Sequence, residues 1–346
     1  MSLEVVIKKK AGSFSLDIAF SAGEEVFALL GASGCGKSMT LKCIAGIETP
    51  DEGRIVLNER VLFDSEKKIN LPPQERGVGY MFQDYALFQN MTVEENIMAG
   101  MHEKRKQVRQ NLVTEYMSTF HLNGLQGQYP RQLSGGQKQR LAMARMMASK
   151  PQVILLDEPF AALDSYLKRQ MLSEMKQELA DRSCPVLLVT HDRDEAFVLG
   201  HTICAMKQGS VDCIQRKREF FANPKTVNAA ILSGCKNITP AHRMDGQHIL
   251  AEDWNIILKM ESENMPFFHI GIRAHDLIPC DKSEDAFHCV AYRIEESLFE
   301  WNIYVTMEGA RKEFLWKIAK EHADSSDVPQ VPAYFTVDKA HILFLQ

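Results

Sequence analysis

The sequence predicts an α/β domain with a mostly parallel sheet, followed by a small all-β domain. Continuous apolar runs at residues 25–30, 153–156 and 185–190 are typical of strands that are buried on both faces of a sheet. Between the last two runs, residues 166–180 carry apolar side chains at the spacing of a helix. Strands that alternate with helices in this way favour a parallel sheet covered by helices.

Residues 84–150 interrupt this alternation, and we expect them to form a helical subdomain inserted into the α/β core. Apolar side chains at i, i+4 spacing indicate one face of a helix there, namely Val108, Leu112, Tyr116 and Phe120. After residue 234 the pattern changes to short β-rich runs separated by turn-prone and charged residues. We therefore predict two domains, residues 1–234 and 235–346.

Composition limits the classes of function that the chain can have. A length of 346 residues fits about two domains. The net charge of -5 argues against bulk attraction to nucleic acid or to an anionic membrane surface. The 8 cysteines form no C-x-x-C pair, which excludes a zinc ribbon and indicates reduced, cytosolic thiols. No signal peptide or membrane-spanning run is evident, so we expect a soluble protein that reaches a membrane only through a partner.

Residues 31–38, "GASGCGKS", follow the first apolar run and precede a helical stretch. The glycines allow successive backbone N–H groups to point at one anion, and the end of the helix adds a partial positive charge. This pattern predicts a phosphate loop in which Lys37 contacts the β- and γ-phosphates and Ser38 holds Mg²⁺. The alternative is a glycine-rich turn with an unrelated lysine, and the flanking strand and helix argue against it.

Other polar residues also follow strand-like runs, so we expect them at the same edge of the sheet. Asp157 and Glu158 end the run at 153–156, where Asp157 would hold Mg²⁺ and Glu158 would polarise an attacking water. Gln83 and His191 each follow another run. Considered alone, Asp157 and Glu158 could form a solvated acidic turn. Gln83 and His191, each considered alone, could have a structural role.

A second glycine motif, "LSGGQ" at residues 133–137, stands before an amphipathic helical stretch. Taken with "GASGCGKS", "FQD", "LLDEP", "AALD" and "THD", in this order, it makes residues 31–192 resemble the ATP-binding subunit of ABC transporters. This resemblance implies a P-loop ABC ATPase core and a small C-terminal accessory domain of the OB-like type. In that family two copies pack head to tail, and each ATP lies between one copy's phosphate loop and the other copy's signature motif.

The resemblance also implies roles for individual residues. Glu158 would be the general base, His191 the switch that stabilises the γ-phosphate, and Gln83 a contact to Mg²⁺ and the attacking water. Phe14 is placed like the aromatic that stacks on adenine, with a core-facing strand residue as the alternative. ATP would be bound by Phe14, Gly31, Ala32, Ser33, Gly34, Cys35, Gly36, Lys37, Ser38, Met39, Ser134, Gly135, Gly136, Gln137 and Asp164, and Mg²⁺ by Ser38, Gln83 and Asp157.

The partners implied are a second copy of the chain, two integral membrane permease subunits and, indirectly, an extracytoplasmic solute-binding protein, but no nucleic acid. The chain would then lie on the cytoplasmic face of the cell membrane. Residues 62–74, "LFDSEKKINLPPQ", resemble the molybdate importer most. Gln89 replaces a proline that is frequent in relatives, and Ala161 replaces a frequent serine.

Alternative functions remain open at this stage. The chain could import sulfate, iron(III), a polyamine or a sugar in place of molybdate. A soluble ABC ATPase of DNA repair or translation is a second class, although the chain has neither a second cassette nor a long coiled-coil insertion. A regulatory ATP binder with little turnover is a third, against which the presence of Glu158 and His191 argues. In the C-terminal region Arg273 and His275 suggest an anion sensor, but we favour a structural role for both.

Overall fold

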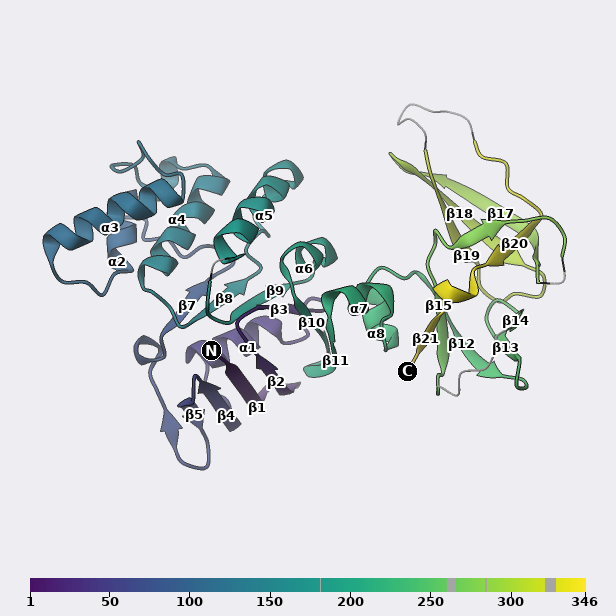
Figure 1. Ribbon diagram of the computed structural model, residues 1–346, viewed down its shortest axis with the longest axis horizontal. Helices are drawn as coiled ribbons and strands as arrows, with labels where there is room; N and C mark the ends of the chain where they lie inside the picture. Colours follow the sequence, from purple (N-terminus) through teal and green to yellow (C-terminus); the bar gives the residue numbers. More distant parts are fainter. Residues whose placement is uncertain (181, 260–265, 284, 321–327) are drawn as a thin grey trace. The chain divides into compact units, whose positions relative to one another are not determined.

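The computed structural model describes residues 1–180, 182–259, 266–283, 285–320 and 328–346. They form two compact units, Met1–Lys217 and Arg218–Gln346 (Figure 1). The domain boundary expected from the sequence, after residue 234, lies beyond two short helices, α7 (Lys217–Ala222) and α8 (Val227–Leu232). Most of α7 and all of α8 belong to the second unit.

An eleven-stranded sheet forms the frame of the first unit, in the order β6-β5-β4-β1-β2-β11-β10-β3-β9-β8-β7. Parallel pairing joins β10 (Thr202–Lys207), β3 (Val26–Leu30), β9 (Val186–Thr190), β8 (Val153–Asp157) and β7 (Val78–Met81). Every residue of β3, β8 and β9 is buried. These are the three apolar runs of the sequence, which confirms their interpretation as buried parallel strands.

The other half of the sheet is largely antiparallel, which the sequence analysis did not resolve. It contains β1 (Leu3–Ala11), β2 (Phe14–Ala22), β4 (Glu52–Leu57), β5 (Arg60–Asp64), β6 (Ile69–Asn70) and β11 (Ser210–Arg216). Burial alternates along β1 and β2, because only one of their faces meets the core. Alternation of this kind is typical of antiparallel strands with one solvated face.

Helices pack around the sheet and also form a separate group (Figure 1). The helices α1 (Lys37–Ala45), α5 (Ser165–Ala180) and α6 (Arg193–Leu199) follow β3, β8 and β9 along the chain. The group in the expected helical subdomain contains α2 (Val93–Ala99), α3 (Lys106–Thr119) and α4 (Gly135–Ala148). On α3 the buried side chains are Val113 and Met117, whereas Val108, Leu112 and Tyr116 of the expected stripe are half-buried.

The second unit contains two five-stranded antiparallel sheets. One has the order β14-β13-β12-β15-β21 and the other β16-β20-β17-β18-β19. Their hydrophobic side chains share one core, which includes Ile249 and Trp254 beside the first sheet and Ile303 and Phe335 from the second. The strands are β12 (Asn237–Arg243), β13 (His248–Ala251), β14 (Ile256–Lys259), β15 (His269–Ile272), β16 (Leu277–Pro279), β17 (Phe287–Glu296), β18 (Glu300–Met307), β19 (Phe314–Ala319), β20 (Tyr334–Val337) and β21 (Leu343–Leu345). The expected β-rich C-terminal domain is confirmed.

Arg273 and His275 lie between β15 and β16. The Arg273 guanidinium donates to the backbone carbonyls of Ser233 and Phe221, and His275 lies beside the Glu300 carboxylate. These contacts join segments of the second unit to one another, so they support the structural role that the sequence analysis favoured.

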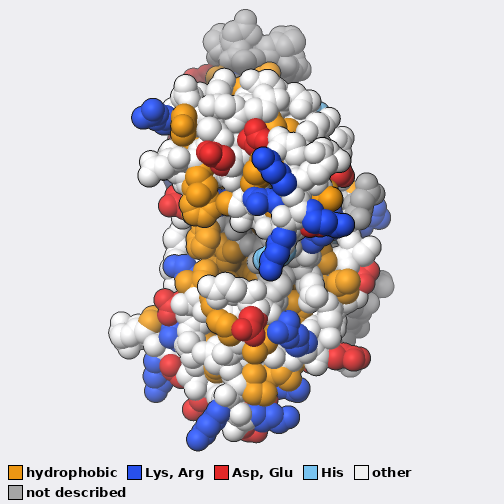
Figure 2. Space-filling model, turned by 90° about the vertical axis from the view of Figure 1, so that its left-hand side faces the viewer, with side chains coloured by type: hydrophobic (Ala, Val, Ile, Leu, Met, Phe, Trp, Pro, Cys, Tyr) orange, Lys and Arg blue, Asp and Glu red, His pale blue; other side chains and the backbone are white. Residues whose placement is uncertain are grey.

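Among the described residues, none of the helices combines the length and the apolar character that a membrane crossing requires. Figure 2 shows the face seen from the left of Figure 1, where hydrophobic patches lie between Lys, Arg, Asp and Glu side chains. Phe88 and Met91, which follow β7, are 48% and 38% exposed. Hydrophobic side chains gathered on a surface are typical of a site that contacts another protein.

Candidate nucleotide-binding and catalytic site

The glycine-rich segment 31–36 forms the turn between β3 and α1. Gly36 directly precedes α1 with a φ of 102°, a conformation that favours glycine. A Cβ atom at Gly36 would lie 2.7 Å from Cδ1 of Leu16 and 3.0 Å from Cζ of Phe14. The backbone conformation and the lack of space therefore both select glycine here.

The Lys37 ammonium group is buried at the centre of this turn. It donates hydrogen bonds to the carbonyl oxygens of Gly31 (2.8 Å) and Ala32 (2.9 Å). Its side chain forms no salt bridge with any described residue, and the residue is 4% exposed. A buried cation that has only dipolar partners favours an anionic ligand, because burial of an unpaired charge is costly. These features fit a phosphate group.

Ser38 and Asp157 join the phosphate loop to the end of β8. The Ser38 hydroxyl donates to Oδ1 of Asp157 at 2.7 Å. Tyr80, on β7, donates to Oδ2 of the same carboxylate at 2.8 Å. Burial, reinforced by the Asp157 charge and hydrogen bond, raises the pKa of Tyr80 well above its ordinary value, so its hydroxyl remains protonated.

A magnesium ion fits the chemistry of this pair, since hard cations prefer oxygen ligands and Ser38 and Asp157 present a hydroxyl and a carboxylate. Within the described part of the chain, no three His, Cys, Asp or Glu side chains are grouped as a metal site. Mg²⁺ would therefore take its other ligands from phosphate and water, as it commonly does.

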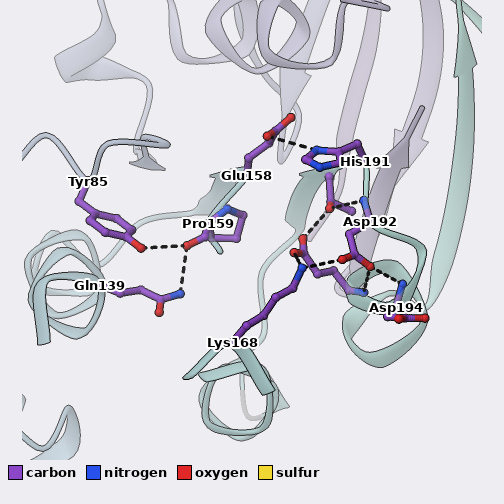
Figure 3. A network of polar contacts seen from close by, with 10 residues as sticks. Tyr85, Gln139, Glu158, Pro159, Lys168, His191, Asp192 and Asp194 are labelled. Atoms are coloured by element: carbon purple, nitrogen blue, oxygen red, sulfur yellow. Dashed lines mark hydrogen bonds and ion pairs between the residues drawn. The ribbon is translucent and has the colours of Figure 1, made fainter. Parts of the chain in front are cut away.

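Glu158 and His191 face each other at the same edge of the sheet. Oε2 of Glu158 lies 3.3 Å from Nδ1 of His191 (Figure 3). Glu158 has a φ of 45°, which is uncommon for a residue with a side chain. Its side chain is 18% exposed and that of His191 is 55% exposed, so water can approach the pair.

Gln83 follows β7 and reaches the same edge, because β7 and β8 are parallel neighbours. Its side chain is exposed and makes no hydrogen bond within the described part of the chain. Phe14, at the start of β2, is half-buried and packs against both the core and Gly36. Its ring therefore lies beside the phosphate loop as well as against the core.

The second glycine motif forms the start of α4. The Ser134 hydroxyl accepts from the Gln137 N–H, and the Gln137 side chain accepts from the Ser134 N–H. This reciprocal pair is a capping box, and it satisfies the Ser134 and Gln137 N–H groups at the start of α4. Gly135 and Gly136 approach Leu163 and Leu167 so closely that added Cβ atoms would lie 3.3 and 3.2 Å from them.

Within one chain the two glycine motifs lie in different regions. Figure 1 shows α4 among the helices of the subdomain and α1 beside the sheet. Asp164 lies near the second motif, and its Oδ1 accepts from the N–H groups of Tyr166 and Leu167 at the start of α5. A single copy thus presents two separate surfaces that can bind an anion.

The Pro159 carbonyl connects the sheet edge that carries Glu158 and His191 with the helical subdomain, a link that the sequence alone does not predict. It accepts from the Tyr85 hydroxyl (3.4 Å) and from the Gln139 side chain (3.2 Å), as Figure 3 shows. Arg145 of α4 donates to the carbonyls of Tyr85 and Ala86. The segment after Gln83 is therefore fixed to the helix that follows the second glycine motif.

Residues 15–161 match the family described as ABC transporter. A sulfate/thiosulfate import ATP-binding protein from Mannheimia succiniciproducens is 38% identical over 266 residues, which span 73% of this chain and 72% of that protein. The chain belongs to the ABC transporter family.

Other relatives are also import ATP-binding proteins. One for Fe(3+) ions from Haemophilus influenzae is 38% identical over 71% of this chain and 70% of its own length. One for molybdenum from Rhodospirillum rubrum is 37% identical over 64% of this chain and 60% of its own length. Among solved structures, the dimeric ATP-binding cassette MJ0796 bound to ADP and Pi has a TM-score of 0.53 and 27% identity, covering 63% of this chain and 99% of its own.

Proposed function

We propose that this ABC transporter family member is the ATP-hydrolysing subunit of an import system and that it works beneath membrane permease subunits as a head-to-tail dimer. The observation that carries the proposal is the grouping of Lys37, Ser38, Asp157, Glu158 and His191 around the carboxyl ends of β3, β8 and β9. The import ATP-binding relatives and the dimeric ADP-bound cassette support it.

Each residue in this group has a distinct part in binding and hydrolysis. Lys37 would exchange its bonds to the Gly31 and Ala32 carbonyls for the β- and γ-phosphates of ATP. Ser38 and Asp157 would hold Mg²⁺, which neutralises charge on the phosphates. Glu158 would accept the proton of the attacking water.

His191 complements Glu158 in this scheme. An imidazole beside the general base can donate to a γ-phosphate oxygen while Glu158 accepts from water. The contact between Glu158 and His191 keeps the two groups within reach of the same reacting atoms. Gln83, exposed at the same edge, would contact the water and Mg²⁺, and Phe14 would stack on adenine.

The signature motif of a second copy would complete each site. The start of α4 presents N–H groups and a partial positive charge, both of which favour a γ-phosphate. ATP would then hold two copies together by contacts that ADP lacks, and hydrolysis would release them. Tyr85, Pro159 and Gln139 would couple this cycle to the permease, because they join Glu158 to the exposed segment around Phe88.

For the transported solute we propose an inorganic oxyanion, with sulfate or thiosulfate ahead of molybdate. Residues 62–74 resemble the molybdate importer most. More of the relatives are sulfate/thiosulfate import proteins, including ones from Brucella melitensis and Synechococcus elongatus. The larger number of sulfate/thiosulfate relatives supports sulfate or thiosulfate over molybdate as the solute. Iron(III) is the second candidate, because Fe(3+) import proteins match at the same identity.

The proposal is tested by measuring ATPase activity of the chain co-purified with its membrane subunits, with the solute-binding protein present. We expect stimulation by sulfate or thiosulfate. Stimulation by molybdate or by iron(III) alone would keep the import mechanism and replace the solute. Failure to recover a membrane subunit, together with unstimulated ATPase activity, would favour a non-transport ABC ATPase.

A further inference from the structure

The backbone of His191 is held on both sides by one hydrogen-bonded cluster. Thr190, just before it, donates from its hydroxyl to Oε2 of Glu195 at 2.5 Å and accepts from the Asp192 N–H at 2.9 Å. Asp192, just after it, accepts from the N–H groups of Asp194 and Glu195 and so caps α6. The position of His191 therefore depends on where Thr190 and Asp192 are fixed.

Lys168 of α5 is the cation at the centre of this cluster. Its Nζ lies 2.5 Å from Oδ2 of Asp192 and 2.5 Å from Oε1 of Glu195. The Glu195 side chain is 5% exposed and that of Lys168 is 22% exposed. Figure 3 shows Lys168 reaching from α5 toward Asp192. Without Lys168, two carboxylates would remain close together in a poorly solvated position, where like charges repel.

The cluster carries these charges at neutral pH. Burial acts to lower the pKa of Lys168, but the hydrogen bonds that it donates to the Asp192 and Glu195 carboxylates outweigh burial and raise the pKa. Burial acts to raise the pKa of Asp192, and the Lys168 and backbone hydrogen bonds outweigh it and lower the pKa. Both groups are therefore ionised throughout the physiological range.

Lys168 also stands one helical turn after Asp164. The Asp164 carbonyl accepts from the Lys168 N–H at 2.9 Å, and the Asp164 carboxylate caps the same turn. The Asp164 loop borders the signature motif, since Gly135 contacts Leu163. The first turn of α5 therefore ties the Asp164 backbone to that of Lys168.

We propose that Lys168 is a positioning residue that links the Asp164 loop to the His191 switch, so that formation of the ATP-bound dimer sets the position of His191. This inference rests on the proposed function. It places no part of Lys168 in contact with ATP, and the effect passes entirely through Asp192, Glu195 and the backbone on either side of His191.

The test compares Lys168→Met, which keeps the length of the side chain without its charge, with Lys168→Arg, which keeps the charge. A matched control is Glu174→Gln, also on α5. Glu174 accepts from Arg140 at 2.8 and 2.9 Å, and its side chain is 26% exposed, so its loss breaks a similar ion pair. Arg140 lies on α4, away from the His191 segment.

We expect Lys168→Met to lower kcat by about 10-fold or more with KM for ATP within about 2-fold, because a small displacement of a catalytic group has effects of this size. Lys168→Arg should retain most of kcat. Glu174→Gln should lower the melting temperature without a comparable loss of kcat. If Lys168→Met does not fold, the double variant Lys168→Met, Glu195→Gln removes both charges of the Lys168–Glu195 ion pair, so that the buried Glu195 carboxylate is not left without its cation. The same loss of kcat is expected.

A second measurement separates this inference from the proposed function. The imidazole signals of His191, recorded by NMR on histidine-labelled protein and assigned with His191→Asn, should shift in Lys168→Met and stay unchanged in Glu174→Gln. Wild-type kcat in Lys168→Met, or unmoved His191 signals, would overturn the role of Lys168. If the His191 signals shift in Lys168→Met but the wild-type protein has no ATPase activity, the link to His191 is upheld and the proposed function is overturned.

Discussion

The carboxylate of Glu158 and the imidazole of His191 lie 3.3 Å apart at the end of adjacent parallel strands, β8 and β9. Both residues follow fully buried strands, so their backbones are fixed while their side chains reach solvent. A base and a hydrogen-bond donor held in this way can act on the same phosphate and the same water.

The variant Glu158→Gln should bind ATP and lose hydrolysis by about 10²- to 10⁴-fold, the usual contribution of a general base. The amide keeps the shape of the side chain and can still contact His191, so folding should be unaffected. Single-turnover hydrolysis and equilibrium ATP binding measure the two effects. Turnover close to that of the wild type would exclude Glu158 as the base.

The variant Ser134→Arg should abolish ATP-dependent dimer formation and leave nucleotide binding by the monomer intact. A matched control exists in the same subdomain, because Thr92 caps α2 with an equivalent capping box to Glu95. Loss of either cap costs about 1 kcal/mol of stability. Only Ser134→Arg, and not Thr92→Arg, should prevent the dimer in light scattering; equal behaviour of the two variants would contradict a role for the signature motif.

Replacing Tyr80 by phenylalanine should destabilise the protein by about 1–3 kcal/mol, because Oδ2 of the buried Asp157 then loses its hydrogen-bond donor. MgATP should restore part of this stability, since a bound cation would interact with the Asp157 oxygen that has lost its hydrogen-bond donor. Tyr116→Phe is the control, because its hydroxyl donates to the Met147 carbonyl, outside the site. Melting temperatures with and without MgATP measure the difference, and equal responses in both variants would count against a cation at Asp157.

The ion pair between Glu174 and Arg140 should make stability depend on pH in the acid range. Burial acts to raise the pKa of Glu174, but hydrogen bonds from Arg140 and Gln170 lower it below its ordinary value. A lowered pKa in the folded state gives stability that is present above about pH 4.5 and is lost as the pH falls through the folded pKa. Glu174→Gln should therefore melt below the wild type at pH 7, and the difference in melting temperature should close as the pH falls through the folded pKa of Glu174. A gap that stays constant would contradict this contribution.

The sequence was sufficient to predict that the candidate site residues that follow strands lie at one edge of the sheet. Asp157, Glu158 and His191 come directly after buried apolar runs, and parallel strands bring their ends to one edge. The same reasoning could not find Tyr80, because a tyrosine inside a strand has the pattern of a core residue. Tyr80 could be recognised only by its position beside Asp157 on the neighbouring strand of the sheet. That position is known only once the strand order is known.

Contacts between elements were also beyond the sequence. The Pro159 carbonyl belongs to the backbone, so the residue type does not indicate its hydrogen-bond partners. Lys168 has the sequence pattern of an ordinary solvent-exposed lysine on a helix. β1 pairs with β2 and β4 in antiparallel register. The sequence could not predict this pairing, because it does not show which face of each strand meets the core. The fold class was thus predictable from local pattern, whereas the network around His191 depended on packing.

In the proposed dimer, one copy's phosphate loop and another copy's signature motif form a single site. Two inactive chains, both with Glu158→Gln to prevent turnover, test this composite site: one adds Lys37→Ala and the other Ser134→Arg. When the two are co-expressed with different tags and purified as a mixed dimer, the intact phosphate loop of one faces the intact signature of the other. We predict retention of tightly bound ATP at about one site per mixed dimer and at none in either variant alone. No retention in the mixed dimer would contradict the account.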